Sequence, residues 1–472
     1  ESILSIFLVI MPFLNFIIAN SEILYFGYYV ELFKLFIFCG LIILSILYFI
    51  HVILSKKFSI KLNTVIFFKI SLVFAITFHY QHLVFFLQKL NISYVNPNYL
   101  SFILIVGFAV YIIFNNKKKF LDFFKIFISI IFIFTCLQLL VTFYSTNSKK
   151  YAPQINNFNM SDYQKNSQQN IYYIIVDAAT NMSQFKKFYD LNDDYFSNFI
   201  NQLNDYQILD NTFSTGKKTS VSLYSVFQLE FNKEFYNIND HQLYPNALRK
   251  EISSNLNLFK LLKQKNYNFS WVTNNFINCS LVDFEKCHIK KKEFLNFYLA
   301  TQFLQQSFVY DVIHKIKPDF YGKSWYKKND AIKNFIKNFD IKKIENNNNF
   351  IFIHHMMPHE PFVYNKKCNY KYFKTSLDNL EKYKEGYFNS YNCMLRRILE
   401  FDEYIKKYDP DAHVLIQGDH GINFSSTNFE SNIINKNLTI YKINENCIRK
   451  DEKIDNSNVE MLKFILKCNF NE

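Results

Sequence analysis

The sequence predicts a helical membrane region of about five spans, followed by an α/β domain whose mostly parallel sheet is covered by helices. Three observations support this prediction. Half of the 472 residues are hydrophobic and only 8 are Gly and 8 Pro, so the chain can bury a large core and is neither disordered nor collagen-like. Long apolar stretches are confined to the first third of the chain. Strand-like and helix-like segments alternate in the remainder, as in α/β domains.

Five apolar stretches approach the roughly 20 residues that a helix needs to cross about 30 Å of hydrocarbon. They are residues 2–19, 35–54, 65–87, 99–114 and 126–143. The third stretch contains Lys69, His79 and His82, of which Lys69 can extend its amine to the membrane surface. A secretory signal peptide is the alternative interpretation of residues 1–19, but the apolar segments that follow favour a multi-span anchor.

The distribution of charge gives the orientation of these spans. Residues 1–150 carry 12 Lys and 4 acidic residues, a net charge of +8, whereas the rest of the chain has a net charge of +5. The basic excess therefore lies in the apolar third and indicates membrane topology, not a nucleic-acid surface. Lysines follow the second and fourth stretches, which assigns those loops to the cytoplasm. Five spans that begin inside deliver the chain after about residue 144 to the outer side.

Three regions follow from this topology. Residues 1–144 are predicted to form the transmembrane anchor, residues 145–170 a polar linker, and residues 171–472 an extracytoplasmic domain. The abundance of Lys, Asn, Ile, Phe and Tyr suggests an AT-rich bacterial genome. The predicted location is therefore the inner membrane of a bacterium, with the outer domain on the periplasmic or extracellular side.

Cysteine usage agrees with an oxidising outer compartment. Two cysteines, Cys39 and Cys136, lie in predicted spans, where they act as small hydrophobes. Six lie in the outer domain, an even number that suits disulfides: Cys279, Cys287, Cys368, Cys393, Cys447 and Cys468. The pairs 279/287 and 447/468 are plausible bridges, although six cysteines allow about 15 connectivities. None of the spacings resembles a zinc knuckle.

The outer domain is predicted to alternate strands and helices. Continuous apolar runs predict strands buried on both faces at residues 171–176, 350–353 and 413–417. Further strands are expected at residues 207–210, 269–272 and 438–443. Helices are expected at residues 194–203, from Thr219 onward, and at residues 258–263, 387–407 and 458–467. This alternation favours a parallel sheet whose ligands lie beyond the carboxyl ends of the strands.

Polar side chains follow three of the buried strands. The first strand is followed by Asp177, the second by His354 and, further on, His359, and the third by the Gly-Asp-His-Gly segment with Asp419 and His420. Strand ends of a parallel sheet meet at one edge, so these groups can converge, and two Asp with a His suit a divalent cation such as Zn or Mn. The alternative is that the Asp are turn residues or N-caps and the His are interior side chains.

Four motifs occur along the chain in the order of a known superfamily. They are Asp177 after a strand, the Thr219-Ser220-Val221-Ser222-Leu223 helix start, the His354–Pro361 segment with its Pro-His-x-Pro, and Gly418-Asp419-His420-Gly421. In these motifs the chain resembles the alkaline-phosphatase-like superfamily. It looks most like the membrane-anchored, sulfatase-like hydrolase/transferase branch, which includes lipoteichoic acid synthases and phosphoethanolamine transferases. The resemblance covers about residues 168–470, and five spans before an outer domain also match that branch.

The resemblance implies the roles of the site residues. Asp177, Thr219, Asp419 and His420 would hold one divalent ion, and Thr219 would also be the nucleophile. His354 and His359 would hold the phosphate or assist the leaving group. Chemistry supports the Thr219 assignment independently, because a Thr hydroxyl needs a cation or base to become a nucleophile, and a helix N-terminus attracts an anion. An ordinary N-cap is the alternative for Thr219.

The chain departs from the family in three respects. Sulfatases of this superfamily mature a Cys or Ser of a Cys/Ser-x-Pro-x-Arg segment into formylglycine, and no Arg of this chain lies in such a segment. This disfavours hydrolysis of sulfate esters by that route. The residues before Thr219 lack the expected aromatic side chain. The first metal ligand is an Asp, where lipoteichoic acid synthases use a Glu.

The predicted function is metal-dependent transfer of a phospholipid head group, phosphoethanolamine or phosphoglycerol, through a covalent Thr219 intermediate. The predicted partners are a membrane phospholipid donor within the lipid bilayer and a cell-envelope glycan or other hydroxyl acceptor, with water giving hydrolysis instead. No nucleic-acid partner is expected. The alternatives are a sulfatase-like or phosphodiesterase hydrolase of a soluble ester, a non-catalytic envelope-binding domain, and a transporter that uses the polar residues of the third stretch.

Overall fold

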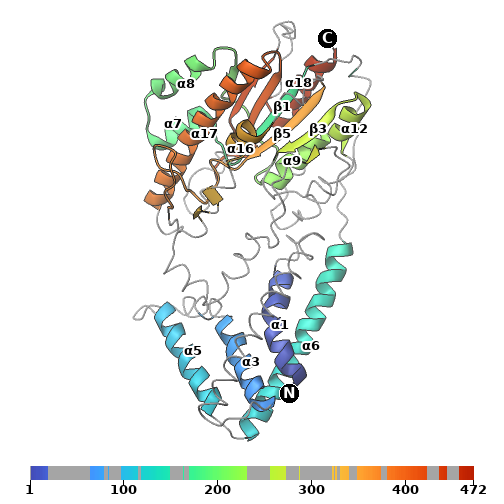
Figure 1. Ribbon diagram of the computed structural model, residues 1–472, viewed down its shortest axis with the longest axis vertical. Coiled ribbons are helices and arrows are strands. Elements are labelled where there is room, and N and C mark those ends of the chain that lie inside the picture. Colours follow the sequence, from blue (N-terminus) through green and yellow to red (C-terminus); the bar gives the residue numbers. More distant parts are fainter. Residues whose placement is uncertain are drawn as a thin grey trace. The chain divides into compact units, whose positions relative to one another are not determined.

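The structure is a computed structural model and is drawn in Figure 1. It describes residues 2–19, 64–78, 97–114, 118–148, 169–230, 256–272, 330–339, 348–373, 380–422, 435–443 and 456–471, together with residues 83, 163, 286–287, 322–323 and 325–326. These residues fall into two compact units. Those up to Ser148 belong to the first unit, and those from Tyr163 onward belong to the second.

The first unit consists of apolar helices. They are α1 (Ser2–Ala19), α3 (Thr64–Phe78), α5 (Pro97–Phe114) and α6 (Lys118–Ser148), and they coincide with four of the five predicted stretches. The remaining stretch, residues 35–54, lies outside the described residues. Phe7, Phe68, Ile112 and Ile128, one from each helix, are buried in a common cluster.

Among the described residues, one helix is long and apolar enough to cross a membrane. This helix is α6, over Lys118–Val141. Shorter apolar helices occur at Phe7–Ile18 and Ile103–Ile112. Large apolar side chains of α6 such as Phe134 and Leu140 are two-thirds exposed, as a helix in contact with lipid requires. The count of five spans stays a prediction.

The second unit is built on a sheet of seven described strands. The strands are β1 (Ile171–Val176), β2 (Gln207–Leu209), β3 (Asn268–Val272), β4 (Lys286–Cys287), β5 (Asn349–His355), β6 (His413–Gly418) and β7 (Thr439–Lys442). Their order across the sheet is β2-β7-β6-β1-β5-β3-β4. The pairs from β6 to β4 are parallel, as predicted, but β7 is antiparallel to both β6 and β2. The sheet is therefore mixed.

Helices cover both faces of this sheet (Figure 1). Alternate residues of β1 enter different cores: Tyr172 and Ile174 join one buried cluster, and Tyr173 and Ile175 join the other. The first cluster is completed by α7 (Met182–Tyr189), α8 (Ser197–Gln202), α16 (Ala331–Asn338) and α17 (Leu380–Tyr408), and the second by α9 (Thr219–Gln228), α12 (Asn257–Gln264) and α18 (Asn458–Asn471). Burial on both faces explains the continuous apolar sequence of β1.

Several elements differ from the sequence-based expectations. The strand predicted to end at Ile353 continues through His355, because β5 pairs with β1 up to its last residue. Helices α7 and α16 and the two-residue strand β4 were not predicted. Helix α7 is short and begins at the N-cap Asn181, whose side chain accepts a hydrogen bond from the Gln184 N–H. Short helices fixed by one cap carry little periodic signal.

A disulfide joins Cys368, in the segment after β5, to Cys393 of α17. The sequence analysis did not select this pair. Cys468 is also disulfide-bonded, whereas Cys279 and Cys447, each one member of a predicted pair, lie outside the described residues. The disulfide fastens the segment that carries His359 to the longest helix of the unit.

Removal of the disulfide by the double substitution Cys368→Ser and Cys393→Ser should destabilise the second unit. Closing a loop across 25 residues of sequence separation contributes about 3 kcal/mol, mainly by restricting the unfolded chain. Thermal unfolding can be followed by tryptophan fluorescence, because both tryptophans, Trp271 and Trp325, belong to this unit. Cys136→Ser is the control, since Cys136 is a free cysteine of α6. An unchanged melting temperature in the double variant would contradict the prediction.

Two fully buried histidines should make the stability of the second unit depend on pH. Burial lowers the pKa of His413 to about 4, with a smaller effect of Lys442, and burial likewise lowers the pKa of His355 to about 4, against the opposing charge of Asp330. The unfolded chain has the ordinary value of 6.5 and binds more protons between pH 6.5 and pH 4. The free energy of unfolding of the second unit should therefore be at its full value above pH 6.5. It should fall by up to about 3 kcal/mol per histidine as the pH approaches 4.

The variant His413→Leu should reduce this acid sensitivity. Neither ring nitrogen of His413 has a hydrogen-bond partner among the described residues, so leucine loses no hydrogen bond there. Melting temperatures measured by tryptophan fluorescence at pH 7 and pH 4.5 should differ less in the variant than in the unaltered protein. Equal differences in the two proteins would show that His413 does not contribute.

Candidate active site

Parallel strand pairing brings the predicted acidic residues together. Strand β1 pairs with β6 so that Val176 lies opposite Gly418, and the next residues of the two strands are Asp177 and Asp419. On its other side β1 pairs with β5, with Ile175 opposite His354. Because these strands run in one direction, side chains that are far apart in the sequence emerge at one edge of the sheet.

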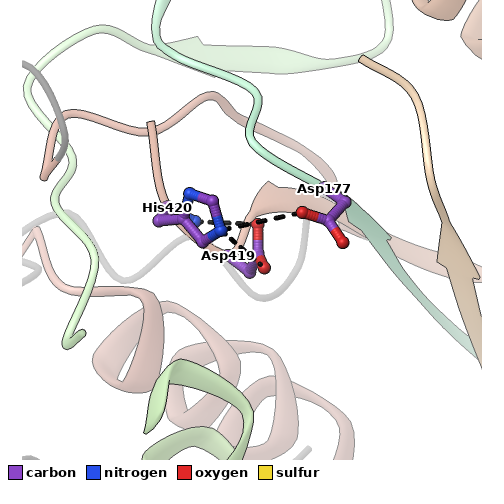
Figure 2. A group of neighbouring side chains, drawn as sticks. All are labelled: Asp177, Asp419 and His420. Carbon is purple, nitrogen blue, oxygen red and sulfur yellow. Dashed lines mark hydrogen bonds and ion pairs between the residues drawn. The ribbon is translucent and has the colours of Figure 1, made fainter. Parts of the chain in front are cut away.

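Asp177, Asp419 and His420 form a compact group in which one ligand-type atom of each residue lies within 4.8 Å of the others. Figure 2 shows the three side chains turned toward one another at the ends of β1 and β6. His420 Nε2 lies 3.7 Å from Asp177 Oδ1 and 3.5 Å from Asp419 Oδ2. All three side chains are buried.

Each carboxylate uses one oxygen within the protein and leaves the other toward the centre of the group. Asp419 Oδ1 accepts hydrogen bonds from the N–H groups of Ala178 (2.9 Å) and His420 (2.8 Å). Asp177 Oδ2 lies 3.2 Å from His354 Nε2. Asp177 Oδ1 and Asp419 Oδ2 are buried and accept no hydrogen bond from any described residue. Two buried carboxylate oxygens without a hydrogen-bond donor destabilise the fold unless a cation binds to them.

The tautomer of His420 fits the same centre. Its Nδ1 lies 2.8 Å from the Gly421 carbonyl oxygen, which can only accept, so Nδ1 carries the proton. In the neutral ring, Nε2 then offers a lone pair to the space between the two carboxylates. A backbone carbonyl that fixes the outer nitrogen is the usual arrangement around a histidine that binds a metal.

Thr219 also lies next to this group. It is the first residue of α9, as predicted, after the N-cap Lys218, and its Oγ1 lies 3.5 Å from His420 Nε2. The segment before α9 is held by Ser214, whose hydroxyl is hydrogen-bonded to the Asp419 carbonyl, and by Asn458, which accepts from the Thr215 N–H and donates to Ser222 Oγ. The hydroxyl is thus positioned by contacts to both β6 and α18.

The two predicted histidines occupy different positions. His354 is buried within β5 and contacts Asp177, whereas His359 is half-buried in the segment after β5. The His359 ring centroid lies 6.4 Å from that of His420, and its Nδ1 lies 2.6 Å from the Glu360 carbonyl oxygen. Nδ1 of His359 is therefore a donor, and Nε2 is the nitrogen left for other partners.

The electrostatics keep Asp177 ionised. Burial alone would raise the pKa of Asp177, but His359, His354 and His420 outweigh burial and lower it to about 2. For His359 the balance is the opposite. Burial lowers the pKa of His359, but the charge of Asp177 and the hydrogen bond to the Glu360 carbonyl together have a larger, opposite effect, so the pKa of His359 lies above its ordinary value. The edge of the sheet therefore combines an ionised carboxylate with an imidazole that holds its proton more tightly than usual.

The structure also identifies residues that sequence reasoning missed. A Cβ atom on Gly418 would lie 2.4 Å from the Ala179 carbonyl oxygen, so glycine permits the close approach of the β1 and β6 exits. Tyr387 of α17 donates a hydrogen bond to the Ala178 carbonyl, next to Asp177. Gly418 was recognised as part of the Gly418-Asp419-His420-Gly421 motif, but without this role, and the sequence contains no signal for Tyr387, which is 210 positions away from Asp177.

The donor set suits a divalent cation. Asp177 Oδ1, Asp419 Oδ2, His420 Nε2 and Thr219 Oγ1 supply three oxygens and one nitrogen, the hard-to-borderline donors that Zn and Mn accept. The two carboxylate oxygens without hydrogen-bond donors are the observation that fits such an ion. Chemically, a buried hydroxyl beside a cation site and a helix N-terminus is suited to attack on an anionic ester.

A comparison with models of protein families agrees with this interpretation of the motifs. The family model described as Sulfatase matches residues 169–448, more than half of the chain. A comparison with curated proteins gives no match. Similar solved structures include the lipooligosaccharide phosphoethanolamine transferase A (EptA) of Neisseria meningitidis, at 12% identity and a TM-score of 0.43, over 99% of this chain and 95% of that one.

Two further structures match the chain over less of its length. The periplasmic domain of EptC of Escherichia coli, in complex with Zn, is 13% identical with a TM-score of 0.38, over 66% of this chain and 84% of that one. An alkaline phosphatase superfamily protein of Vibrio parahaemolyticus is 12% identical with a TM-score of 0.37, over 68% and 72%. At these values none of the structures assigns a substrate to this chain.

The family match includes every residue of the site, from Asp177 at the end of β1 to His420 after β6. The predicted resemblance to the alkaline-phosphatase-like superfamily is therefore confirmed at the level of the family. The chain belongs to the sulfatase family and is a sulfatase-like hydrolase or transferase.

Proposed function

We propose that the chain transfers a phospho-linked head group from a membrane phospholipid to a hydroxyl of a cell-envelope glycan, with Thr219 as the nucleophile. The observation that carries the proposal is the convergence of two donor-free carboxylate oxygens, the His420 Nε2 and the Thr219 hydroxyl on one buried point. A structural sheet edge has no need for this set, because unpaired buried carboxylates destabilise a fold.

Asp177, Thr219, Asp419 and His420 would hold one divalent ion, Zn or Mn. When bound, such an ion would supply positive charge to the ester oxygens and lower the pKa of a neighbouring hydroxyl. The protein itself contributes ligands that are already oriented: Asp419 by two N–H groups, Asp177 by His354, and His420 by the Gly421 carbonyl. Ligands held in this way lose little conformational freedom on binding.

In the proposed reaction Thr219 Oγ1, after losing its proton to solvent, attacks the phosphorus of a phosphodiester. The Oγ1–P bond forms, the bond from phosphorus to the diacylglycerol oxygen breaks, and the leaving oxygen takes a proton. His359 suits this proton transfer, because Asp177 and the Glu360 carbonyl favour its protonated form and its Nδ1 is already engaged. An acceptor hydroxyl, or water, then gives its proton to His359 and attacks phosphorus. The Oγ1–P bond breaks, and Thr219 Oγ1 leaves as the oxyanion that began the cycle.

The two histidines therefore receive different proposed roles. The sequence analysis assigned both His354 and His359 to the phosphate or the leaving group. His354 Nε2 is 3.2 Å from Asp177 Oδ2 and its side chain is buried, so we assign it to orienting that carboxylate. His359 is the more accessible of the two and remains the candidate acid and base. Mutation of either would reduce activity, but through different steps.

The proposed location is the bacterial inner membrane, with residues 1–144 as the anchor, residues 145–170 as the linker and residues 171–472 outside. The Lys-rich loops and the apolar outward face of α6 support the membrane anchor. The Cys368–Cys393 disulfide supports an oxidising, extracytoplasmic compartment. A domain tethered to a bilayer has phospholipid as its most concentrated ester, which favours a lipid donor over a soluble one.

Replacement of the nucleophile, Thr219→Ala, should abolish head-group transfer while the protein still folds. Without Oγ1 no covalent intermediate can form, so the rate should fall by at least about 10³-fold. The full chain in detergent is incubated with phosphatidylethanolamine or phosphatidylglycerol, and diacylglycerol release is measured. Ser225→Ala is the matched control, because Ser225 is a hydroxyl residue of the same helix that donates to the Val221 carbonyl.

Mass spectrometry of the peptide that contains Thr219 should show a head-group adduct in the unaltered protein only. Parallel incubations with aryl sulfate and aryl phosphate esters distinguish a hydrolase of soluble esters from a lipid-dependent transferase. Undiminished diacylglycerol release by Thr219→Ala would refute the proposed nucleophile. Turnover of soluble esters alone would favour the alternative activity, and metal binding without turnover of any ester would favour a non-catalytic binding domain.

Metal binding should be lost when either free carboxylate oxygen is neutralised. In the unaltered full chain, Zn or Mn at a hundred times its Kd should stabilise the second unit by about 2.7 kcal/mol, seen as a higher melting temperature. Asp177→Asn and Asp419→Asn should each remove this increase. Asp409→Asn, which alters a carboxylate bound by Asn170 and Tyr172, should retain it. An unchanged metal-dependent increase in Asp419→Asn would exclude Asp419 as a ligand.

A further inference from the structure

The loop that carries Asp177 is bound by two buried tyrosine hydroxyls of α17. Tyr387 donates a hydrogen bond to the Ala178 carbonyl (2.9 Å) and accepts one from the Thr180 N–H (3.3 Å). Tyr391, one turn further along α17, donates to the Thr180 carbonyl (2.9 Å). Both side chains are almost completely buried, with 1% and 0% exposure. The hydroxyls thus bind three backbone groups within three residues of Asp177.

The backbone of this loop needs such support. Ala178 has a φ of 61°, in the left-handed region that costs a residue with a Cβ atom about 1 kcal/mol or more. Its N–H donates to Asp419 Oδ1, and its carbonyl accepts from Tyr387. Both polar groups of the strained residue are therefore fixed, one by the second acidic residue of the site and the other by α17. The same residue links the positions of Asp177 and Asp419.

The packing of the two rings does not account for their hydroxyls. Both tyrosines belong to the same apolar cluster, and the Tyr391 ring is stacked on Phe185 with the centroids 4.0 Å apart. Phenylalanine would provide the same ring contacts without a polar group to bury. A buried hydroxyl stabilises a fold only when its hydrogen bonds replace those to water, and here the Asp177 loop provides its partners.

We infer that Tyr387, supported by Tyr391, is a positioning residue that sets the separation of the Asp177 and Asp419 carboxylates and thereby the affinity of the site for a divalent cation. This inference rests on the proposed metal site but assigns the residues outside it that determine its geometry. Tyr387 acts on Asp177 through the Ala178 peptide, and it touches neither the ion nor the substrate. Tyr391 acts on the same loop two residues further from Asp177, so its effect should be smaller.

The protonation state of the two tyrosines supports the inference. Burial raises the pKa of Tyr387 and that of Tyr391 above their ordinary value, so both hydroxyls stay protonated. They therefore remain hydrogen-bond donors to the Ala178 and Thr180 carbonyls at neutral pH.

The test compares three variants that each lose one tyrosine hydroxyl of α17: Tyr387→Phe, Tyr391→Phe and Tyr404→Phe. Tyr404 is the matched control, because its hydroxyl also donates to a backbone carbonyl, that of Phe339, away from the Asp177 loop. The Kd for Zn and for Mn is measured on the full chain in detergent by competition with a chelating dye. Melting temperatures of the metal-free proteins are measured by tryptophan fluorescence.

Tyr387→Phe should weaken metal binding about 10- to 100-fold, the usual effect of losing a residue that orients a metal ligand. Tyr391→Phe should weaken it less, and Tyr404→Phe should leave the Kd unchanged. All three can lower the melting temperature, because each loses a buried hydrogen bond, so a lower melting temperature with an unchanged Kd in Tyr387→Phe would overturn the inference. If Tyr387→Phe does not fold, Tyr391→Phe provides the comparison with Tyr404→Phe, and equal Kd values would again overturn it.

The outcome is separable from that of the proposed reaction. Metal affinity is measured without substrate. A protein that binds Zn or Mn, binds it more weakly in Tyr387→Phe and transfers no head group would therefore support the role of Tyr387 and refute the proposed transfer. An unaltered protein that binds neither metal would refute both. Where transfer is detected, Tyr387→Phe should regain activity at high metal concentration, whereas Thr219→Ala should not.

Discussion

The parallel register of β1 with β6 is the constraint on which the site depends. It places Val176 opposite Gly418, and the next residue of each strand is an aspartate. Side chains alternate between the faces of a sheet, so a slip of one residue would move Asp419 away from Asp177 and disrupt both apolar clusters at once. The same residues therefore provide the stability of the fold and the position of the acidic pair. Gly418 is part of this constraint, since the Ala179 carbonyl leaves no room for a Cβ atom.

The acidic pair is unfavourable for folding in itself, and its surroundings offset that cost only partly. Two buried carboxylates repel each other and lose their hydration. Asp419 Oδ1 is compensated by two N–H groups, and Asp177 is compensated by three histidines that hold its pKa at about 2. A proton therefore does not neutralise Asp177 at physiological pH. The negative charge of the two carboxylates that these groups do not compensate is available to a cation. In a buried ion pair, by contrast, the partner side chain already compensates that charge.

Much of the site could be predicted from the sequence, because its residues follow strands with a strong apolar signal. Asp177, Asp419 and His420 come directly after buried runs, and Thr219 is the first residue of a helix, as expected. The contact of His354 with Asp177 could not be predicted, because it depends on β5 extending two residues beyond its apolar run. The strand β7 was predicted, but its antiparallel direction was not, since four residues do not indicate the direction of a strand.

The parts contributed by α17 are outside the reach of sequence patterns. Its apolar periodicity predicts a helix that packs on the sheet, but Tyr387 and Tyr391 are typical core residues in that pattern. Their hydroxyls acquire a role only when α17 is placed against the Asp177 loop. The disulfide between Cys368 and Cys393 is similar, because six cysteines specify no pairing until the chain is folded. Contacts between segments that are distant in the sequence, such as these, could not be predicted from the single sequence.

The chain belongs to the sulfatase family, but the chemistry that we propose for its site depends on residue 219. Formylglycine is an aldehyde whose hydrate has two hydroxyls on one carbon, so an ester formed on one of them can be expelled by the other. Thr219 has a single hydroxyl, and an ester on it can be released only by a second nucleophile that attacks the bound group itself. By microscopic reversibility that nucleophile enters where the first leaving group departed, so one acid-base group serves both steps. We propose His359 for this double use, because it is half-buried beside the site and its pKa is raised above the ordinary value, so that it binds a proton more readily. In the proposed reaction, the bound group passes to the hydroxyl that occupies the leaving-group position, which is the property that the proposed transfer to a glycan requires.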